Sequence, residues 1–192
     1  MPRRAALLAA ALVMTTVPAF AHPGHGSGAA PFLAGLVHPL SGLDHVVAMV
    51  AVGLWAAFLG WRASWMVSWA FIVGIVGGFA LAATGIQLPF VEAGIAASVL
   101  VLGLLVVAAV RLPLGFSAFI AGVFAVFHGH AHGTEAPDAM LLFGAGFVVT
   151  SAMLQAAGIG IGRLLAGPRF ALARALGAGA AGIGLALLGG PS

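Results

Sequence analysis

The chain has 192 residues, of which 62% are hydrophobic and 6% are charged, and its formal net charge is +3. A soluble domain is about 45–50% apolar and about 25% charged, so this composition excludes a water-soluble globule and predicts an all-α integral membrane protein. The absence of cysteine excludes disulfides and thiolate metal sites, and the few arginines form no basic patch that would favour nucleic acid as a partner.

The first 21 residues have the pattern of a secretory signal peptide. Arg3 and Arg4 give a positive start, Ala5–Val17 is apolar, and Ala19–Ala21 fits a small-residue cleavage site. We predict cleavage after Ala21, with an uncleaved first helix as the alternative. The predicted regions are then a signal peptide at 1–21, a histidine-containing exported tail at 22–30 and a membrane domain at 31–192.

Six further apolar stretches are long enough to cross a bilayer, which takes about 20 residues of helix. They are Pro31–Leu59, Ser64–Thr84, Phe90–Val110, Leu114–His132, Ala139–Ile161 and Phe170–Leu188. The first would be about 43 Å long as a straight helix, which exceeds the ~30 Å hydrocarbon core. Because Pro39 and Gly42 interrupt it, we predict a six-helix bundle whose first span is broken between these residues.

The placement of arginine predicts how the bundle is oriented. Alternate connections carry Arg62, Arg111, and the pair Arg163 and Arg169, whereas the other connections carry no arginine. Positively charged connections face the cytoplasm. The mature N-terminus and the C-terminus are therefore predicted to be periplasmic in a bacterial inner membrane, and a cleaved signal requires the same orientation.

Glycines, tryptophans and a few polar residues have more general roles in this prediction. Gly74/Gly78 and Gly158/Gly162 have the spacing that lets membrane helices pack closely, and the glycine-rich last span leaves association of copies open. The tryptophans are expected to form an interfacial belt. Polar residues of the fifth span are expected to pack between helices, with an inward path as the alternative. The tryptophans are Trp55, Trp61, Trp65 and Trp69. The residues of the fifth span are Thr150, Ser151, Met153 and Gln155.

Seven histidines carry the strongest functional signal of the chain. They are His22, His25, His38, His45, His128, His130 and His132. In the predicted topology all of them lie in the exported tail or on the outer side of the membrane. Neutral imidazole is the commonest metal ligand among side chains, so the sequence predicts capture of a metal ion from outside.

The first histidine group is His38-Pro-Leu-Ser-Gly-Leu-Asp44-His45, at the predicted break. Irregular backbone at membrane depth is tolerated only where protein or a water-filled cavity covers it. We therefore expect His38 and His45 to bind metal, with Asp44 binding the ion or orienting an imidazole. The alternative is a kinked helix whose polar residues are satisfied internally.

The second group is His128-Gly-His130-Ala-His132-Gly-Thr-Glu135. On a helix, His128 and His132 share a face and can chelate one ion, and we count His130 and Glu135 among the candidate metal ligands as well. Glu135 joins that face if the helix continues, whereas His130 then points to the other side. The alternative is a solvated helix end.

Two further elements complete the predicted site. Glu92 lies near the outer end of the third span, where a carboxylate usually faces the bundle interior. In the tail, a free amine at His22 with His25 would chelate an ion, and a merely solvated tail is the alternative.

These motifs resemble the HupE/UreJ family of nickel permeases, which is associated with hydrogenase and urease. The resemblance covers nearly the whole chain and rests on the His38–His45 motif, the Phe127–Glu135 segment and Pro89–Glu92 at the entry to the third span. It implies uptake of Ni²⁺, with Co²⁺ as a second candidate. The residues alone indicate only a divalent transition metal, Zn²⁺ included, since imidazole and carboxylate ligands suit several of these ions.

The absence of a phosphate-binding loop predicts that this chain hydrolyses no nucleotide, so transport would be secondary, and we expect no organic cofactor. Two alternatives stay open at this point. One is an intramembrane zinc-dependent hydrolase, although the HExxH motif is absent. The other is a metal-binding sensor or accessory protein without transport.

Overall fold

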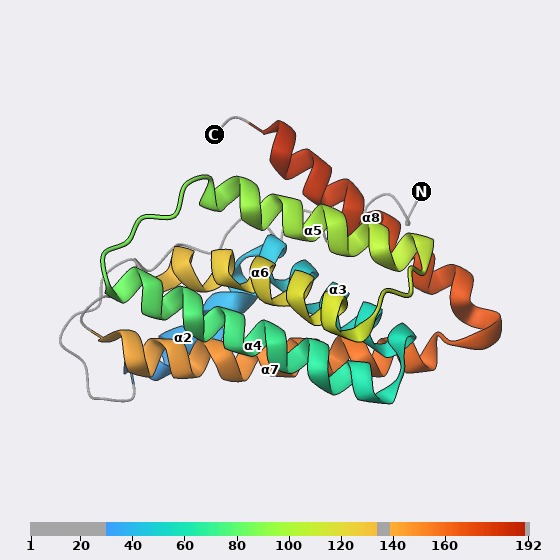
Figure 1. The fold of residues 1–192 in the computed structure, drawn as a ribbon, viewed down its shortest axis with the longest axis horizontal. Coiled ribbons are helices and arrows are strands. Elements are labelled where there is room, and N and C mark those ends of the chain that lie inside the picture. Colours follow the sequence, from blue (N-terminus) through green and yellow to red (C-terminus); the bar gives the residue numbers. More distant parts are fainter. Residues whose placement is uncertain (1–29, 134–138, 191–192) are drawn as a thin grey trace, which may run out of the picture.

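The computed structural model describes residues 30–133 and 139–190, in which helices joined by short connections are the only regular secondary structure (Figure 1). The predicted signal peptide and exported tail lie outside the described residues, apart from Ala30. The elements are α2 (Ala30–Ser41), α3 (Leu43–Leu59), α4 (Trp61–Ala83), α5 (Val91–Ala108), α6 (Leu114–Gly133), α7 (Met140–Leu164), the 3₁₀ turn η2 (Gly167–Arg169) and α8 (Phe170–Gly189). Helices α4 to α8 are each long and apolar enough to cross a membrane, and α2 with α3 makes a sixth, bent span. The predicted all-α membrane bundle is confirmed.

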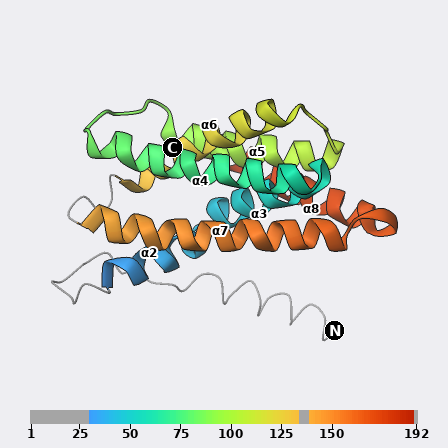
Figure 2. The ribbon, with the colours of Figure 1, turned by 60° about the horizontal axis from the view of Figure 1, so that its bottom comes forward.

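The first span breaks at Gly42, where α2 and α3 meet at 81°. Pro39 lies in the last turn of α2, and a proline inside a helix removes a backbone hydrogen bond and favours its end. Helix α3 alone is about 26 Å long and nearly crosses the ~30 Å core. Helix α2 instead lies against the first half of α7 (Figure 2), where the Thr150 hydroxyl donates a hydrogen bond to the Leu36 carbonyl at 2.7 Å.

Two connections are shorter than predicted. A single residue, Gly60, joins α3 to α4 and has φ 104°, a conformation that glycine adopts at little steric cost. The prediction of a four-residue connection at 60–63 is therefore wrong, and Arg62 lies in the first turn of α4. Helix α7 likewise continues past Ile161 to Leu164, so Arg163 lies inside it.

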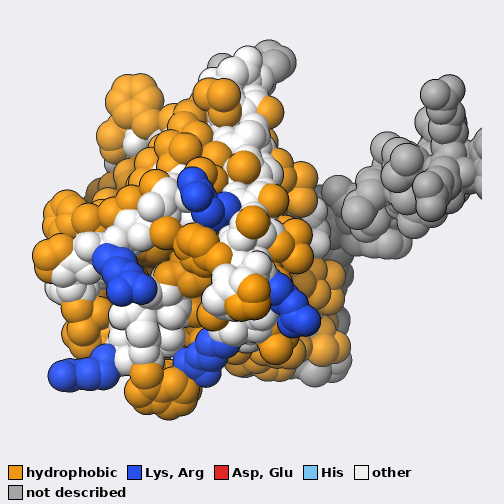
Figure 3. Space-filling model, turned by 90° about the vertical axis from the view of Figure 1, so that its right-hand side faces the viewer, with side chains coloured by type: hydrophobic (Ala, Val, Ile, Leu, Met, Phe, Trp, Pro, Cys, Tyr) orange, Lys and Arg blue, Asp and Glu red, His pale blue; other side chains and the backbone are white. Residues whose placement is uncertain are grey.

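The connections that carry or adjoin Arg62, Arg111, Arg163 and Arg169 lie at one end of the bundle. The α3–α4, α5–α6 and α7–α8 connections share this end, and the α4–α5 and α6–α7 connections share the other (Figure 1). Figure 3 shows arginine side chains spread over the first of these end faces. The alternation predicted from the sequence is thus present in the fold, and the membrane orientation stays a prediction.

Glycines bring the helix backbones into contact. A β-carbon at Gly78 of α4 would lie 2.3 Å from the Val126 carbonyl oxygen of α6, and one at Gly158 of α7 would lie 2.2 Å from the Val50 carbonyl oxygen of α3. Both predicted glycine pairs therefore pack helices within the bundle. Helices α4 and α6, α5 and α8, and α3 and α7 form the most extensive pairs.

Three of the four tryptophans have the exposure that an interfacial belt requires, and the belt itself stays a prediction. Trp61, Trp65 and Trp69 are exposed on α4 near the arginine end. Trp55 is fully buried, and its indole Nε1–H donates a hydrogen bond to the Val110 carbonyl at 3.0 Å. The interfacial role expected of Trp55 is therefore wrong, because this side chain closes the core between α3 and the end of α5.

Candidate metal centre

Four imidazole rings converge at the end of the bundle opposite the arginines. The α2–α3 break supplies His38 and His45, and the last turns of α6 supply His128 and His132. The ring centroid of His132 is 4.3 Å from that of His38 and 4.5 Å from that of His45, and the His45 and His128 centroids are 4.9 Å apart. Two motifs distant in the sequence thus form one cluster, which we call the four-histidine cluster.

His45 is held between Asp44 and His132. Its Nδ1 lies 2.9 Å from Asp44 Oδ1, and its Nε2 lies 2.5 Å from Nε2 of His132. Because the carboxylate can only accept, Nδ1 of a neutral His45 carries the proton and Nε2 keeps the lone pair. A carboxylate placed in this way fixes the tautomer in which Nε2 can bind a metal.

Gly42 leaves the space that this pair occupies. A β-carbon at Gly42 would lie 2.6 Å from Asp44 Oδ1 and 2.8 Å from His45 Nδ1. The residue that breaks the first span therefore also gives room for the hydrogen bond between the two side chains. Gly42 therefore determines both the break between α2 and α3 and the arrangement of the Asp44 and His45 side chains.

Ser98 of α5 orients His128, a role that the sequence analysis missed. The Ser98 hydroxyl donates to the Ile95 carbonyl at 2.6 Å, and its oxygen lies 2.9 Å from Nε2 of His128. Since that hydroxyl has one proton, Nε2–H of His128 is the donor and Nδ1 keeps the lone pair. His128 is fully buried, and its Nδ1 has no hydrogen-bond partner in the described structure. A lone serine in an apolar span carries no sequence signal for this contact.

Aromatic side chains surround the cluster. Phe147 of α7 is fully buried, and its ring centroid lies 5.0 Å from that of His132. The centroids of His38 and His45 are 6.1 and 6.0 Å from the same ring. Phe71 of α4 lies 5.9 Å from His128. The two phenylalanine rings give the cluster an apolar surrounding on this side, and electrostatic interactions are stronger in an apolar surrounding than in water.

The arrangement offers a pair of facing nitrogens with two flanking rings. Among the described residues, no three His, Asp or Glu side chains form a complete ligand set around one point. Nε2 of His45 and Nε2 of His132 already face each other, while His38 and the free lone pair of His128 lie beside them. Full coordination of an ion therefore requires small side-chain rotations or a further ligand.

The remaining predicted ligands do not join the cluster in the described structure. Nε2–H of His130 donates a hydrogen bond to the Ile86 carbonyl at 2.7 Å, because α6 stays helical through this residue and turns it to the other face. Glu92 is exposed in the first turn of α5. Glu135, His22 and His25 lie outside the described residues.

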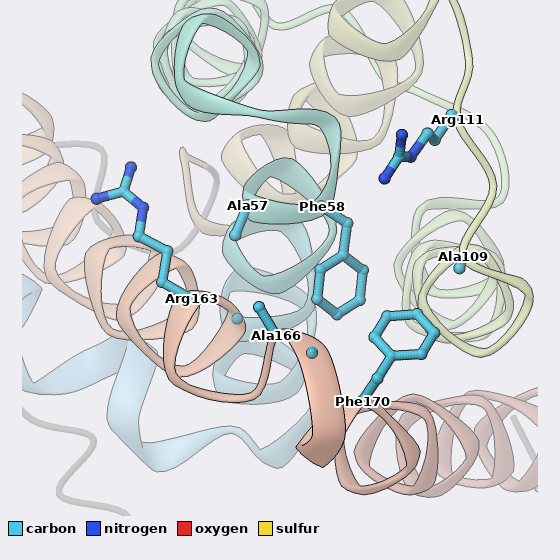
Figure 4. A pocket seen from close by; sticks show the side chains of 9 residues that line it. Ala57, Phe58, Ala109, Arg111, Arg163, Ala166 and Phe170 are labelled. Carbon is cyan, nitrogen blue, oxygen red and sulfur yellow. The ribbon is translucent and has the colours of Figure 1, made fainter.

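A cavity of about 350 Å³ at the arginine end is lined by residue types that differ from those of the four-histidine cluster. Arg111, Phe58 and Phe170 line it, with the two phenylalanine ring centroids 5.2 Å apart (Figure 4). Arg163 also lines it, but its guanidinium lies over the Trp61 ring at 4.6 Å. No imidazole or carboxylate lines this cavity, so it offers no transition-metal ligands.

The described residues thus form a multi-pass helical bundle of membrane-spanning length with four clustered histidines at one end. Residues 10–187 match the family model described as HupE / UreJ protein. The chain is also 44% identical over 182 residues to Protein HupE of Rhizobium leguminosarum bv. viciae, a match that covers 93% of this chain and 95% of that protein. No solved structure matches the chain. The chain belongs to the HupE/UreJ family.

Proposed function

We propose that the protein takes up Ni²⁺ across the bacterial inner membrane and supplies it for hydrogenase or urease. The observation that carries this proposal is the convergence of His38, His45, His128 and His132 at one end of a membrane bundle. Family membership supports the nickel assignment, since HupE/UreJ proteins are associated with nickel uptake. The mature N-terminus and the C-terminus are periplasmic in this proposal, so the cluster faces the outside.

The donor set favours a borderline transition metal. Imidazole nitrogen and carboxylate oxygen suit Ni²⁺, Co²⁺ and Zn²⁺, and a chain without cysteine offers no thiolate. We infer Ni²⁺ as the main cargo and Co²⁺ as a second one. Binding weakens at low pH because protonated imidazoles cannot coordinate a metal.

Acidic residues compensate the charge of the ion in this proposal. Asp44 acts through His45, and Glu135, which lies two residues beyond the end of α6 in the sequence, is a second candidate carboxylate. Glu92 lies in the first turn of α5, and Gly94 of the same turn region packs against Phe127 of α6, the residue before His128. The exported residues His22 and His25 form a capture tail that raises the local concentration of the ion.

Uptake by purified protein in liposomes tests the proposal. Vesicles with the wild-type protein should accumulate nickel without ATP, and excess Co²⁺ should compete more strongly than Mg²⁺, which prefers oxygen ligands. Nickel binding without accumulation would contradict transport and favour the sensor or accessory protein. Family membership does not favour the alternative of a zinc-dependent hydrolase. Metal-dependent hydrolysis without nickel uptake would support that alternative.

Ser98→Ala is expected to weaken nickel binding by about 10–100-fold, the usual cost of losing a partner that orients a metal-binding imidazole. Without the Ser98 oxygen, the proton of His128 is free to move to Nδ1 and block the lone pair. Titration of nickel into detergent-solubilised protein measures this change. Ser117→Ala is the matched control, because Ser117 is equally buried but bonds only to Leu112 and Pro113 carbonyls at the arginine end. Equal affinities of the two variants would remove Ser98 from the site.

A further inference from the structure

Gln155 of α7 has a buried amide group that is unpaired among the described residues. Its side chain is 1% exposed, and neither its amide oxygen nor its amide nitrogen has a hydrogen-bond partner in the described structure. Burying an amide without hydrogen-bond partners is strongly unfavourable, and lipid offers no donor or acceptor to replace them. Its polar neighbours Thr150 and Ser151 differ, since their hydroxyls donate to the Leu36 and Phe147 carbonyls.

Gln155 lines a cavity of about 360 Å³ between α4 and α7. Ser68 of α4 lines the same cavity, and its hydroxyl oxygen is buried and also without a partner. Trp61, Trp65 and Trp69 form the outer wall. Because both side chains line one cavity and have unpaired polar atoms, water or an ion in this cavity would satisfy them.

Three helices lead from the four-histidine cluster to this cavity. Along α7, Gln155 lies about 12 Å beyond Phe147, which contacts three of the histidine rings. Along α3, Gly53 lies about 12 Å beyond His45 and packs on the Gln155 backbone, where a β-carbon would be 2.1 Å from the carbonyl oxygen. Along α4, Ser68 is one turn from Phe71, which contacts His128.

We propose that Gln155 and Ser68 form a second, neutral oxygen site for the partly hydrated divalent cation, about two helical turns inward from the four-histidine cluster. This inference rests on the proposed function. An amide oxygen and a hydroxyl replace part of the hydration shell but add no negative charge, so the ion is held weakly and leaves quickly, as conduction requires. Arg163 at the arginine end of the cavity, held over Trp61, further opposes trapping of a cation there.

The Gln155→Leu variant distinguishes the role of this oxygen site from that of the four-histidine cluster. The change keeps the size of the side chain and removes its polar atoms, so the folded state loses no hydrogen bond. Uptake of nickel into liposomes should fall about ten-fold or more because an apolar surface replaces the oxygen site, while equilibrium nickel binding to the cluster stays within about two-fold. Gln87→Leu is the matched control, since Gln87 is exposed in the α4–α5 connection.

Cysteine labelling tests whether water reaches the cavity. The natural chain has no cysteine, so Ser68→Cys carries a single thiol, and thiols react as thiolates, which need water. Ser68→Cys should react with a small water-soluble methanethiosulfonate. Val73→Cys, on the lipid-exposed surface of the same helix, should not.

Two results would overturn the inference. One is uptake by Gln155→Leu equal to that of Gln87→Leu, and the other is labelling of Ser68→Cys no faster than that of Val73→Cys, as expected if lipid fills the cavity. A wild-type protein that binds nickel but moves none would contradict the proposed function instead. The labelling would then still decide whether the cavity holds water.

Discussion

Replacing His132 by glutamine is expected to lower nickel affinity and uptake by about 100-fold or more. The loss of a partner that only orients a ligand already costs about 10–100-fold, and His132 faces His45 directly with Nε2 atoms 2.5 Å apart. His45→Gln should have the same effect. Nickel titration in detergent and uptake in liposomes measure both quantities.

His130→Gln provides the matched control for this prediction. His130 lies two residues away on the same helix, but its ring nitrogen donates to the Ile86 carbonyl and not into the cluster. A glutamine amide retains a donor for that carbonyl, so affinity and uptake should stay close to those of the wild type. Equal losses at positions 130 and 132 would mean that the helix end as a whole is needed, and the assignment of ligands by face would fail.

Gly78→Ala is expected to destabilise the protein by about 1–3 kcal/mol or more, the usual cost of overpacking. A β-carbon there would lie 2.3 Å from the Val126 carbonyl oxygen and 2.6 Å from the His130 backbone nitrogen. Both atoms belong to the α6 backbone, so the helix must move, and α6 carries His128 and His132. We therefore expect a lower midpoint of thermal unfolding together with weaker nickel binding.

Gly77→Ala is the adjacent control. A β-carbon at Gly77 meets nothing within 4 Å, so alanine should leave stability unchanged or raise it by up to about 1 kcal/mol through helix propensity. Thermal unfolding in detergent compares the two variants directly. If Gly77→Ala unfolded as early as Gly78→Ala, close contact between α4 and α6 would not be the cause.

The sequence allowed the spans and the broken first helix to be predicted because both depend on local patterns. Apolar length defines a membrane helix, and Pro39 and Gly42 mark a place where a helix is unfavourable. The one-residue turn at Gly60 was not predictable, since its length follows from the packing of α3 on α4. Trp55 was misassigned because periodicity does not distinguish a core side chain from an interfacial one in a uniformly apolar helix.

The candidate site was likewise predictable only in part from the sequence. The short spacing of His38, Asp44 and His45 made their proximity predictable, and topology placed His128 and His132 at the same end. The contact between His45 and His132 joins residues 87 positions apart and depends on how α3 meets α6. The roles of Ser98 and Gln155 depend on hydrogen bonds made or lacking across helices, which no pattern along the chain records.

X-ray absorption at the nickel edge tests the central claim most directly, because it reports the atoms bound to the ion. The nickel-loaded wild-type protein should show a first shell of nitrogen and oxygen with the outer scattering of several imidazole rings. That imidazole contribution should decrease in His132→Gln and stay unchanged in His130→Gln. A first shell without imidazole, or a spectrum that His132→Gln leaves unaltered, would contradict the four-histidine cluster as the metal site.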